Sequence, residues 1–125
     1  MIALDYRDKR PIYEQIVEKL EKLIVCGALE SNSKMPSVRT LAMELSVNPN
    51  TIQRAYAQLE QDGYLYTVVG RGNYVTSEKE WKRGRTLEVM SQLEAVLIKA
   101  RESRVPRGEL EALLDRIYKE EGVNS

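Results

Sequence analysis

The side chains best suited to chemistry in this sequence gather in one short stretch, between Asn48 and Arg54. Asn and Gln amides pair with adenine, the Arg guanidinium pairs with guanine, and Thr contacts a phosphate or the thymine methyl group. No Asp or Glu lies within the stretch, so no carboxylate would repel phosphate groups there. The stretch therefore has the chemistry of a surface that reads bases. Its candidate residues are Asn48, Pro49, Asn50, Thr51, Gln53 and Arg54.

Two short amphipathic helices are predicted to present these side chains, because apolar residues recur at intervals of three and four. The stripes are Val38, Leu41, Ala42 and Leu45 in the first helix, and Ile52, Ala55, Tyr56 and Leu59 in the second. Residues 46–48 separate the helices, which predicts the tight corner of a helix-turn-helix. Asn48 is a strong N-cap and Pro49 suits the first helical position. Ser46 stands where many such turns have glycine, and serine is tolerated there if its φ stays negative.

A β-hairpin is predicted next. Residues 64–69 and 73–76 are rich in β-branched and aromatic side chains, and they flank Gly70, Arg71 and Gly72. A hairpin beside a helix-turn-helix is a wing, and a cation at its tip can reach a groove or a phosphate. The alternative is that these three residues form an ordinary solvated turn.

The helix predicted before the helix-turn-helix is interpreted as scaffold. It begins at Pro11, ends at Gly27, and carries the apolar stripe Ile12, Ile16, Leu20, Leu23 and Ile24. Tyr13 and Gln15 are interpreted as ordinary surface or packing residues. Cys26 is the only cysteine, which excludes a disulfide within the chain, and it is expected to be a reduced packing residue.

The C-terminal part is predicted to form a helical dimerisation tail over residues 86–125. The two apolar stripes are Leu87, Met90, Leu93 and Leu97, and Leu110, Leu113, Leu114 and Ile117. Two helices cannot enclose both stripes alone, so we expect them to pack against a second copy. The alternative is that they fold back on the winged domain. That domain is assigned to residues 1–77, and a charged connector anchored by Trp81 is assigned to residues 78–85.

Five ordered motifs carry a family resemblance: PIYEQI (residues 11–16), MPSVRTLA (35–42), VNPNTIQRAY (47–56), LEQDG (59–63) and GRGNYV (70–75). The sequence resembles the GntR family of bacterial winged-helix transcription regulators, and its short remainder resembles the YtrA-like branch. The resemblance implies a mainly α fold with a small β-hairpin wing. It also implies that Ser37 caps a helix on which Arg39 contacts phosphate, and that residues 70–72 form the wing. The contacts implied on the recognition helix, residues 48–61, are Asn48, Asn50, Thr51, Gln53 and Arg54.

The function implied is sequence-specific binding of double-stranded DNA at an inverted-repeat operator by a homodimer. The resemblance favours repression over activation. The alternative is a winged helix that contacts another protein, which need not keep amides and cations turned outward.

Composition bounds the remaining function classes. The chain of 125 residues has no histidine, so a histidine triad, a metal site and an enzyme are not expected. No cofactor is expected, and a small-molecule effector is possible but unspecified. No signal peptide or apolar run of membrane length occurs, which indicates a cytoplasmic protein without a membrane partner. Since 19 basic residues balance 19 acidic ones, DNA binding must depend on how the charges are distributed.

Overall fold

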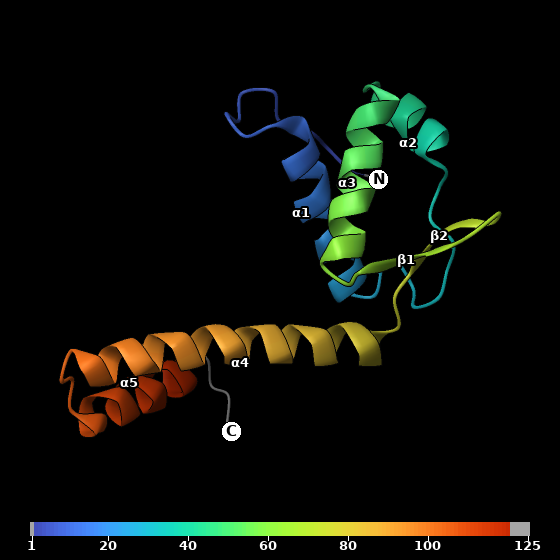
Figure 1. Cartoon of the computed structure of the whole chain (residues 1–125). Helices are drawn as coiled ribbons and strands as arrows, with labels where there is room; N and C mark the ends of the chain where they lie inside the picture. Colours follow the sequence, from blue (N-terminus) through green and yellow to red (C-terminus); the bar gives the residue numbers. More distant parts are fainter. Residues whose placement is uncertain (1, 121–125) are drawn as a thin grey trace. The chain divides into compact units, whose positions relative to one another are not determined.

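The structure is a computed structural model that describes residues 2–120. It has a mainly helical fold with one small antiparallel sheet, as the sequence predicted (Figure 1). The elements are α1 (Ile12–Val25), α2 (Val38–Leu45), α3 (Pro49–Gln61), β1 (Leu65–Val68), β2 (Gly72–Val75), α4 (Glu78–Glu102) and α5 (Arg107–Glu120). The chain divides into two compact units, Met1–Gly84 and Arg85–Ser125. Across the described range, none of the helices has the length and apolar character needed to cross a membrane.

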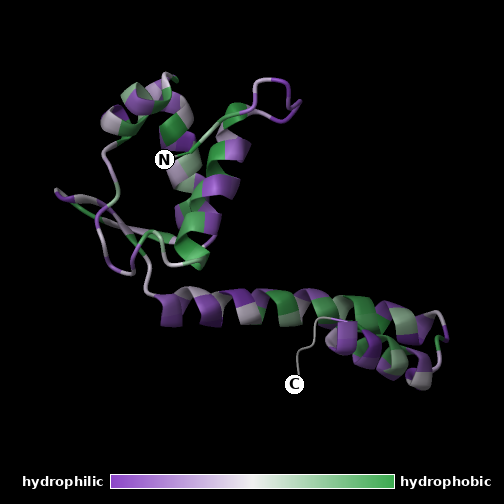
Figure 2. Ribbon diagram, turned by 180° about the vertical axis from the view of Figure 1, so that it is seen from behind, coloured by the Kyte–Doolittle hydropathy of each residue, from purple (hydrophilic) through white to green (hydrophobic). Residues whose placement is uncertain are grey.

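The core of the first unit forms where the apolar stripes of α1, α2 and α3 meet. Ile16, Leu41 and Ile52 are completely buried there, as the spacing of three and four residues predicted. Green apolar segments alternate with purple polar ones along these helices, which is the pattern of amphipathic elements (Figure 2). The fully buried or nearly buried apolar residues are Ile16, Leu20, Ile24, Met35, Leu41, Ala42, Ile52, Ala55, Tyr56, Leu59, Tyr64, Leu65, Val75 and Trp81.

The predicted hairpin is present. Its first strand is shorter than the expected 64–69, and its second strand has the expected length but lies one residue earlier than 73–76. Val68 pairs with Gly72, and the Arg71 N–H donates to the Val68 carbonyl at 2.9 Å to close the turn. Gly70 and Gly72 have φ of 80° and 120°, values that favour glycine because it has no Cβ. Because Gly72 pairs with Val68, it belongs to strand β2, and the turn consists of residues 69–71.

A third extended segment lines the hairpin, which the sequence analysis did not anticipate. Lys34 forms an antiparallel bridge with Tyr74. The Met35 N–H donates to the Asn73 carbonyl at 2.8 Å, and the Asn32 N–H donates to the Val75 carbonyl at 2.8 Å. Backbone groups of the segment before α2 are thereby paired with the wing, which fixes the wing next to the helix-turn-helix.

The connector expected over residues 78–85 is instead helical and forms the start of α4. Its charged residues favour a helix because Glu78 pairs with Lys82 one turn later, at 2.6 Å. Trp81 anchors this turn as predicted, since it is only 7% exposed and its ring centroid lies 5.9 Å from that of Tyr64. Core packing thus extends to Trp81, although the charged residues around it are typical of a segment exposed to solvent.

One expectation about α1 is wrong, and the structure gives Gln15 a definite place. Cys26 is exposed because the helix ends at Val25, one residue before it. Gln15 is 2% exposed, and its side chain makes two hydrogen bonds to the backbone of Asp5: the Asp5 N–H donates to Oε1 and Nε2 donates to the Asp5 carbonyl, both at 3.0 Å. Gln15 is therefore a buried polar residue that fixes the chain before α1.

Candidate nucleic-acid interface

Both helices of the helix-turn-helix begin at the caps that the sequence predicted. Asn48 Oδ1 accepts from the Asn50 N–H at 2.8 Å, and Pro49 occupies the first turn of α3. Ser37 Oγ accepts from the Thr40 N–H at 3.1 Å at the start of α2. These bonds satisfy backbone donors that a helix N-terminus leaves free, so the sequence defines where each helix starts.

The turn between α2 and α3 differs from the expectation in one respect. Ser46 has φ 55° and ψ 45°, which is the left-handed region rather than negative φ. The following Val47 N–H donates to the Ala42 carbonyl at 3.0 Å, so the corner satisfies a carbonyl at the end of α2. The tight corner is kept in spite of a side chain that disfavours this backbone conformation.

Residues of the predicted reading surface lie on the outward side of α3. The Ile52 and Leu59 side chains point into the core with no exposure. Six candidates are placed on α3 or its cap, and five of them are exposed while Thr51 is half-buried: Asn48, Pro49, Asn50, Thr51, Gln53 and Arg54. The first carboxylate after them on α3 is that of Glu60, which accepts from the Thr67 hydroxyl at 3.1 Å. The N-terminal two turns of α3 therefore offer amide and guanidinium groups without a carboxylate.

One residue of the scaffold helix lies against this surface. The guanidinium carbon of Arg54 lies 3.9 Å from the ring centroid of Tyr13 in α1. Tyr13 is half-buried and packs against the core. The sequence analysis did not predict this contact with Arg54, although Tyr13 belongs to the PIYEQI motif that helped to carry the family resemblance.

Cations from two other elements are also exposed. Arg39 lies in the first turn of α2, and Arg71 lies in the turn of the wing between Gly70 and Gly72. Neither has an ion-pair partner among residues 2–120. Val69, which precedes Gly70 in the wing turn, is 95% exposed. Both arginines are thus available to phosphate groups, which bind cations strongly.

Two acidic residues near the start of α1 are paired with cations, Asp8 before the helix and Glu18 within it. Arg10 bonds to the carboxylates of Asp8 and Glu18, and Lys22 lies 3.1 Å from Glu18. Hydrogen bonds from Arg10 hold the pKa of Asp8 and that of Glu18 below their ordinary values. The charges in this region compensate one another, whereas Arg39 and Arg71 lie elsewhere in a chain of zero formal net charge.

Tyr56 joins α3 to the segment before α2. Its hydroxyl donates to the Pro36 carbonyl at 2.8 Å, next to the Ser37 cap. Burial, with a smaller contribution from the charge of Glu44, raises the pKa of Tyr56 to about 12. The neutral hydroxyl therefore helps to fix the N-terminus of α2, where Arg39 lies.

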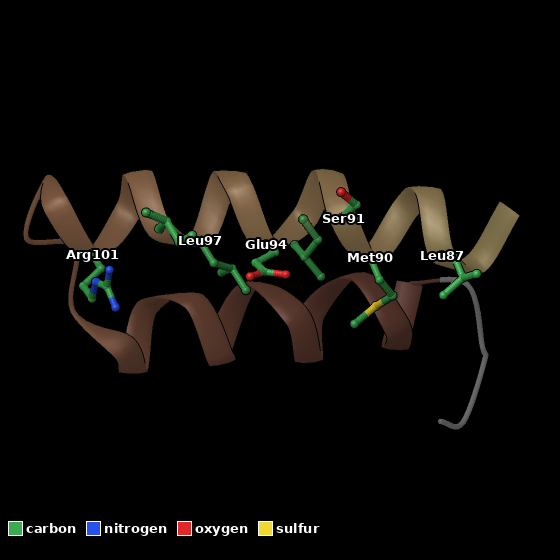
Figure 3. Close-up of a pocket in the computed structure, with 8 residues that line it drawn as sticks. Leu87, Met90, Ser91, Glu94, Leu97 and Arg101 are labelled. Carbon is green, nitrogen blue, oxygen red and sulfur yellow. The ribbon is translucent and has the colours of Figure 1, made fainter. Parts of the chain in front are cut away.

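The second unit exposes the apolar side chains that were assigned to dimerisation. Figure 3 shows Leu87, Met90 and Leu97 along α4, where they line an open hollow together with Glu94 and Arg101. Leu93 is 43% exposed and Leu97 is 41% exposed. Within the described part of α5 no residue is buried. Leu110 is half-buried, and the others predicted on its stripe are exposed: Leu113, Leu114 and Ile117. The unit leaves both stripes largely uncovered.

With this geometry established, comparison with known proteins decides the family. Residues 12–75 match the sequence model of the bacterial regulatory proteins of the gntR family. The chain belongs to the GntR family. Its relatives include the HTH-type transcriptional repressor YtrA of Bacillus subtilis strain 168, which is 37% identical over 102 residues, 80% of this chain and 78% of that protein. This GntR family member therefore resembles YtrA well beyond the winged part.

Solved structures that are similar to this chain have the same fold. YtrA from Sulfolobus acidocaldarius, a GntR-family transcription factor, is 30% identical with a TM-score of 0.58, over 95% of this chain and 97% of that one. The DNA-binding domain of AraR in complex with operator ORE1 is 29% identical with a TM-score of 0.53, over 61% of this chain and 93% of that one. The fold and the YtrA-like resemblance predicted from the sequence are thereby confirmed.

Proposed function

We propose that this GntR family chain, a DNA-binding transcription regulator, reads its operator by inserting α3 into the major groove with its N-terminus leading. The observation that supports this most directly is the exposed, carboxylate-free face that carries Asn50, Gln53 and Arg54. Recognition helices place such side chains against base edges. The operator complex of the similar AraR domain supports the same partner, double-stranded DNA.

In this proposal the remaining candidates position the protein on the duplex. Arg39 contacts phosphate from the first turn of α2, while Arg71 contacts the backbone or the minor groove from the wing. The N–H groups at the start of α3 add a site for a phosphate. These contacts carry no sequence information and set the register in which α3 reads.

We further propose that the regulator acts as a homodimer on an inverted repeat. Support comes from the exposed apolar stripes of α4 and α5, since soluble proteins rarely leave such stripes in water. A two-fold dimer presents two α3 helices to half-sites that mirror its symmetry. The name of the YtrA relative favours repression, and binding to operator DNA favours a cytoplasmic location.

Selection of bound duplexes from a random pool tests the function. The wild type should enrich two half-sites related by two-fold symmetry. Asn50→Ala and Arg54→Ala should each cost about 1–3 kcal/mol and relax preference at one base pair per half-site. Arg107→Ala removes a cation whose side chain is 91% exposed on α5, and it should change neither affinity nor preference. A wild type that enriches no sequence would mean that the exposed face of α3 does not read bases.

A further inference from the structure

The contact between Arg54 and Tyr13 joins a candidate base reader to the scaffold helix α1. The guanidinium carbon lies 3.9 Å from the ring centroid, well inside the distance of about 6 Å at which a cation is attracted to an aromatic face. Tyr13 is the second residue of α1 and Arg54 lies near the middle of α3. The contact therefore depends on the packing of α1 against α3.

The ring of Tyr13 is a fixed surface rather than a mobile side chain. It is half-buried and packs against the hydrophobic core. Its hydroxyl makes only a long, exposed hydrogen bond to Glu14 Oε1, at 3.4 Å, which is too long to orient the ring. Core packing holds the aromatic face, so the hydroxyl can be removed without releasing the ring.

Arg54 keeps its polar groups available while it lies on the ring. Its side chain is exposed, and within residues 2–120 it makes no hydrogen bond or ion pair. A guanidinium that stacks its face on a ring leaves the N–H groups in its plane free to make hydrogen bonds. Those N–H groups are the ones that pair with O6 and N7 of guanine.

We propose that Tyr13 is a positioning residue that holds Arg54 extended over its ring before DNA arrives, so that the guanidinium edge meets a guanine. This inference rests on the proposed function, in which Arg54 reads a base. An arginine that is already ordered loses less conformational freedom on binding. Tyr13 therefore contributes to specificity through Arg54 without contacting a base itself.

A comparison of Tyr13→Phe with Tyr13→Leu tests the proposal, since phenylalanine keeps the aromatic face and leucine keeps only the apolar volume. Affinity is measured for duplexes that carry each base pair at the position identified with Arg54→Ala. Tyr13→Leu should lower affinity for the preferred duplex about threefold to tenfold and affect the other duplexes less. Tyr13→Phe should stay within about twofold of the wild type, as removal of an exposed hydrogen bond costs little.

A double-mutant cycle determines whether the effect passes through Arg54. In the Arg54→Ala background, Tyr13→Leu should have no further effect on operator affinity. Additive losses would overturn the proposal, as would an equal loss on all duplexes. A Tyr13→Phe loss as large as that of Tyr13→Leu would also overturn it, because the hydroxyl would then be the group that matters.

Proton NMR of the free wild-type protein provides a readout that needs no variant of the core. The ring current of Tyr13 should shift the Arg54 Cδ protons upfield, and resonances at ordinary positions would overturn the proposal even if Tyr13→Leu failed to fold. The proposed function fails separately, if the wild type selects no sequence. A wild type that selects a sequence but gives an additive cycle refutes the role of Tyr13 alone.

Discussion

Ser46, at the corner of the helix-turn-helix, should give a more stable protein when it is replaced by glycine. Its φ of 55° and ψ of 45° cost an L residue about 1–2 kcal/mol, because Cβ approaches the following carbonyl oxygen. Glycine avoids this cost but has more freedom in the unfolded chain, which takes back about 0.4–1 kcal/mol. The Ser46 side chain is exposed, so little packing is lost. We expect a net gain of about 0.5–1 kcal/mol in the free energy of unfolding.

Urea unfolding of the full chain at one fixed concentration measures this gain, because the apparent stability of an oligomer depends on concentration. The midpoint should rise by about 0.3–0.5 M with an unchanged slope. Gly63→Ser is the reverse control: Gly63 has φ of 87° and nothing within 4 Å of an added Cβ, so the substitution should destabilise by a similar amount. A lower midpoint for Ser46→Gly would refute the argument from backbone strain.

Three further outcomes are expected. The pKa of Tyr56 is raised from 10.0 to about 12, so its contribution to stability is complete below about pH 10 and is lost as the pH rises toward 12. Tyr56→Phe should lose about 1 kcal/mol at neutral pH and show a smaller fall in that window, as followed by urea unfolding at each pH. Arg39→Ala should weaken binding to all duplexes alike and lower the slope of log affinity against log salt by about one unit; altered base preference would contradict its role at phosphate. Leu93→Glu should give monomers in sedimentation at micromolar concentration, whereas Gln92→Glu, about 100° away around α4, should not; a monomeric wild type would rule out the dimer.

The features that the sequence predicted well are those set by local rules. Ser37 and Asn48 are caps because their side-chain oxygens reach the free N–H groups of the next turn. The stripe through Ile52 and Leu59 is buried because helical periodicity places those side chains on one face. Gly70 marks the wing because its positive φ is difficult for other residues.

The features that were missed depend on contacts between distant segments. Lys34 pairs with the wing across some forty residues, and no local pattern predicts which backbone edge a loop will meet. Gln15 can be buried because its side-chain amide hydrogen-bonds to both the backbone N–H and the backbone carbonyl of Asp5. Tyr13 and Arg54 are neighbours only because two helices pack together. Such contacts are decided by tertiary packing, whereas propensity acts within one element.

The folding unit extends past residues 12–75, the stretch that matches the gntR family model. Before residue 12, Ile2 and Leu4 pack against the core, and the side-chain amide of Gln15 holds the segment that carries them by a hydrogen bond from the Asp5 N–H. After residue 75, the buried indole of Trp81 is part of the same core. A protein cut to residues 12–75 would therefore lose apolar residues that pack on the core at both ends. A preparation of the winged unit alone should retain these flanking residues.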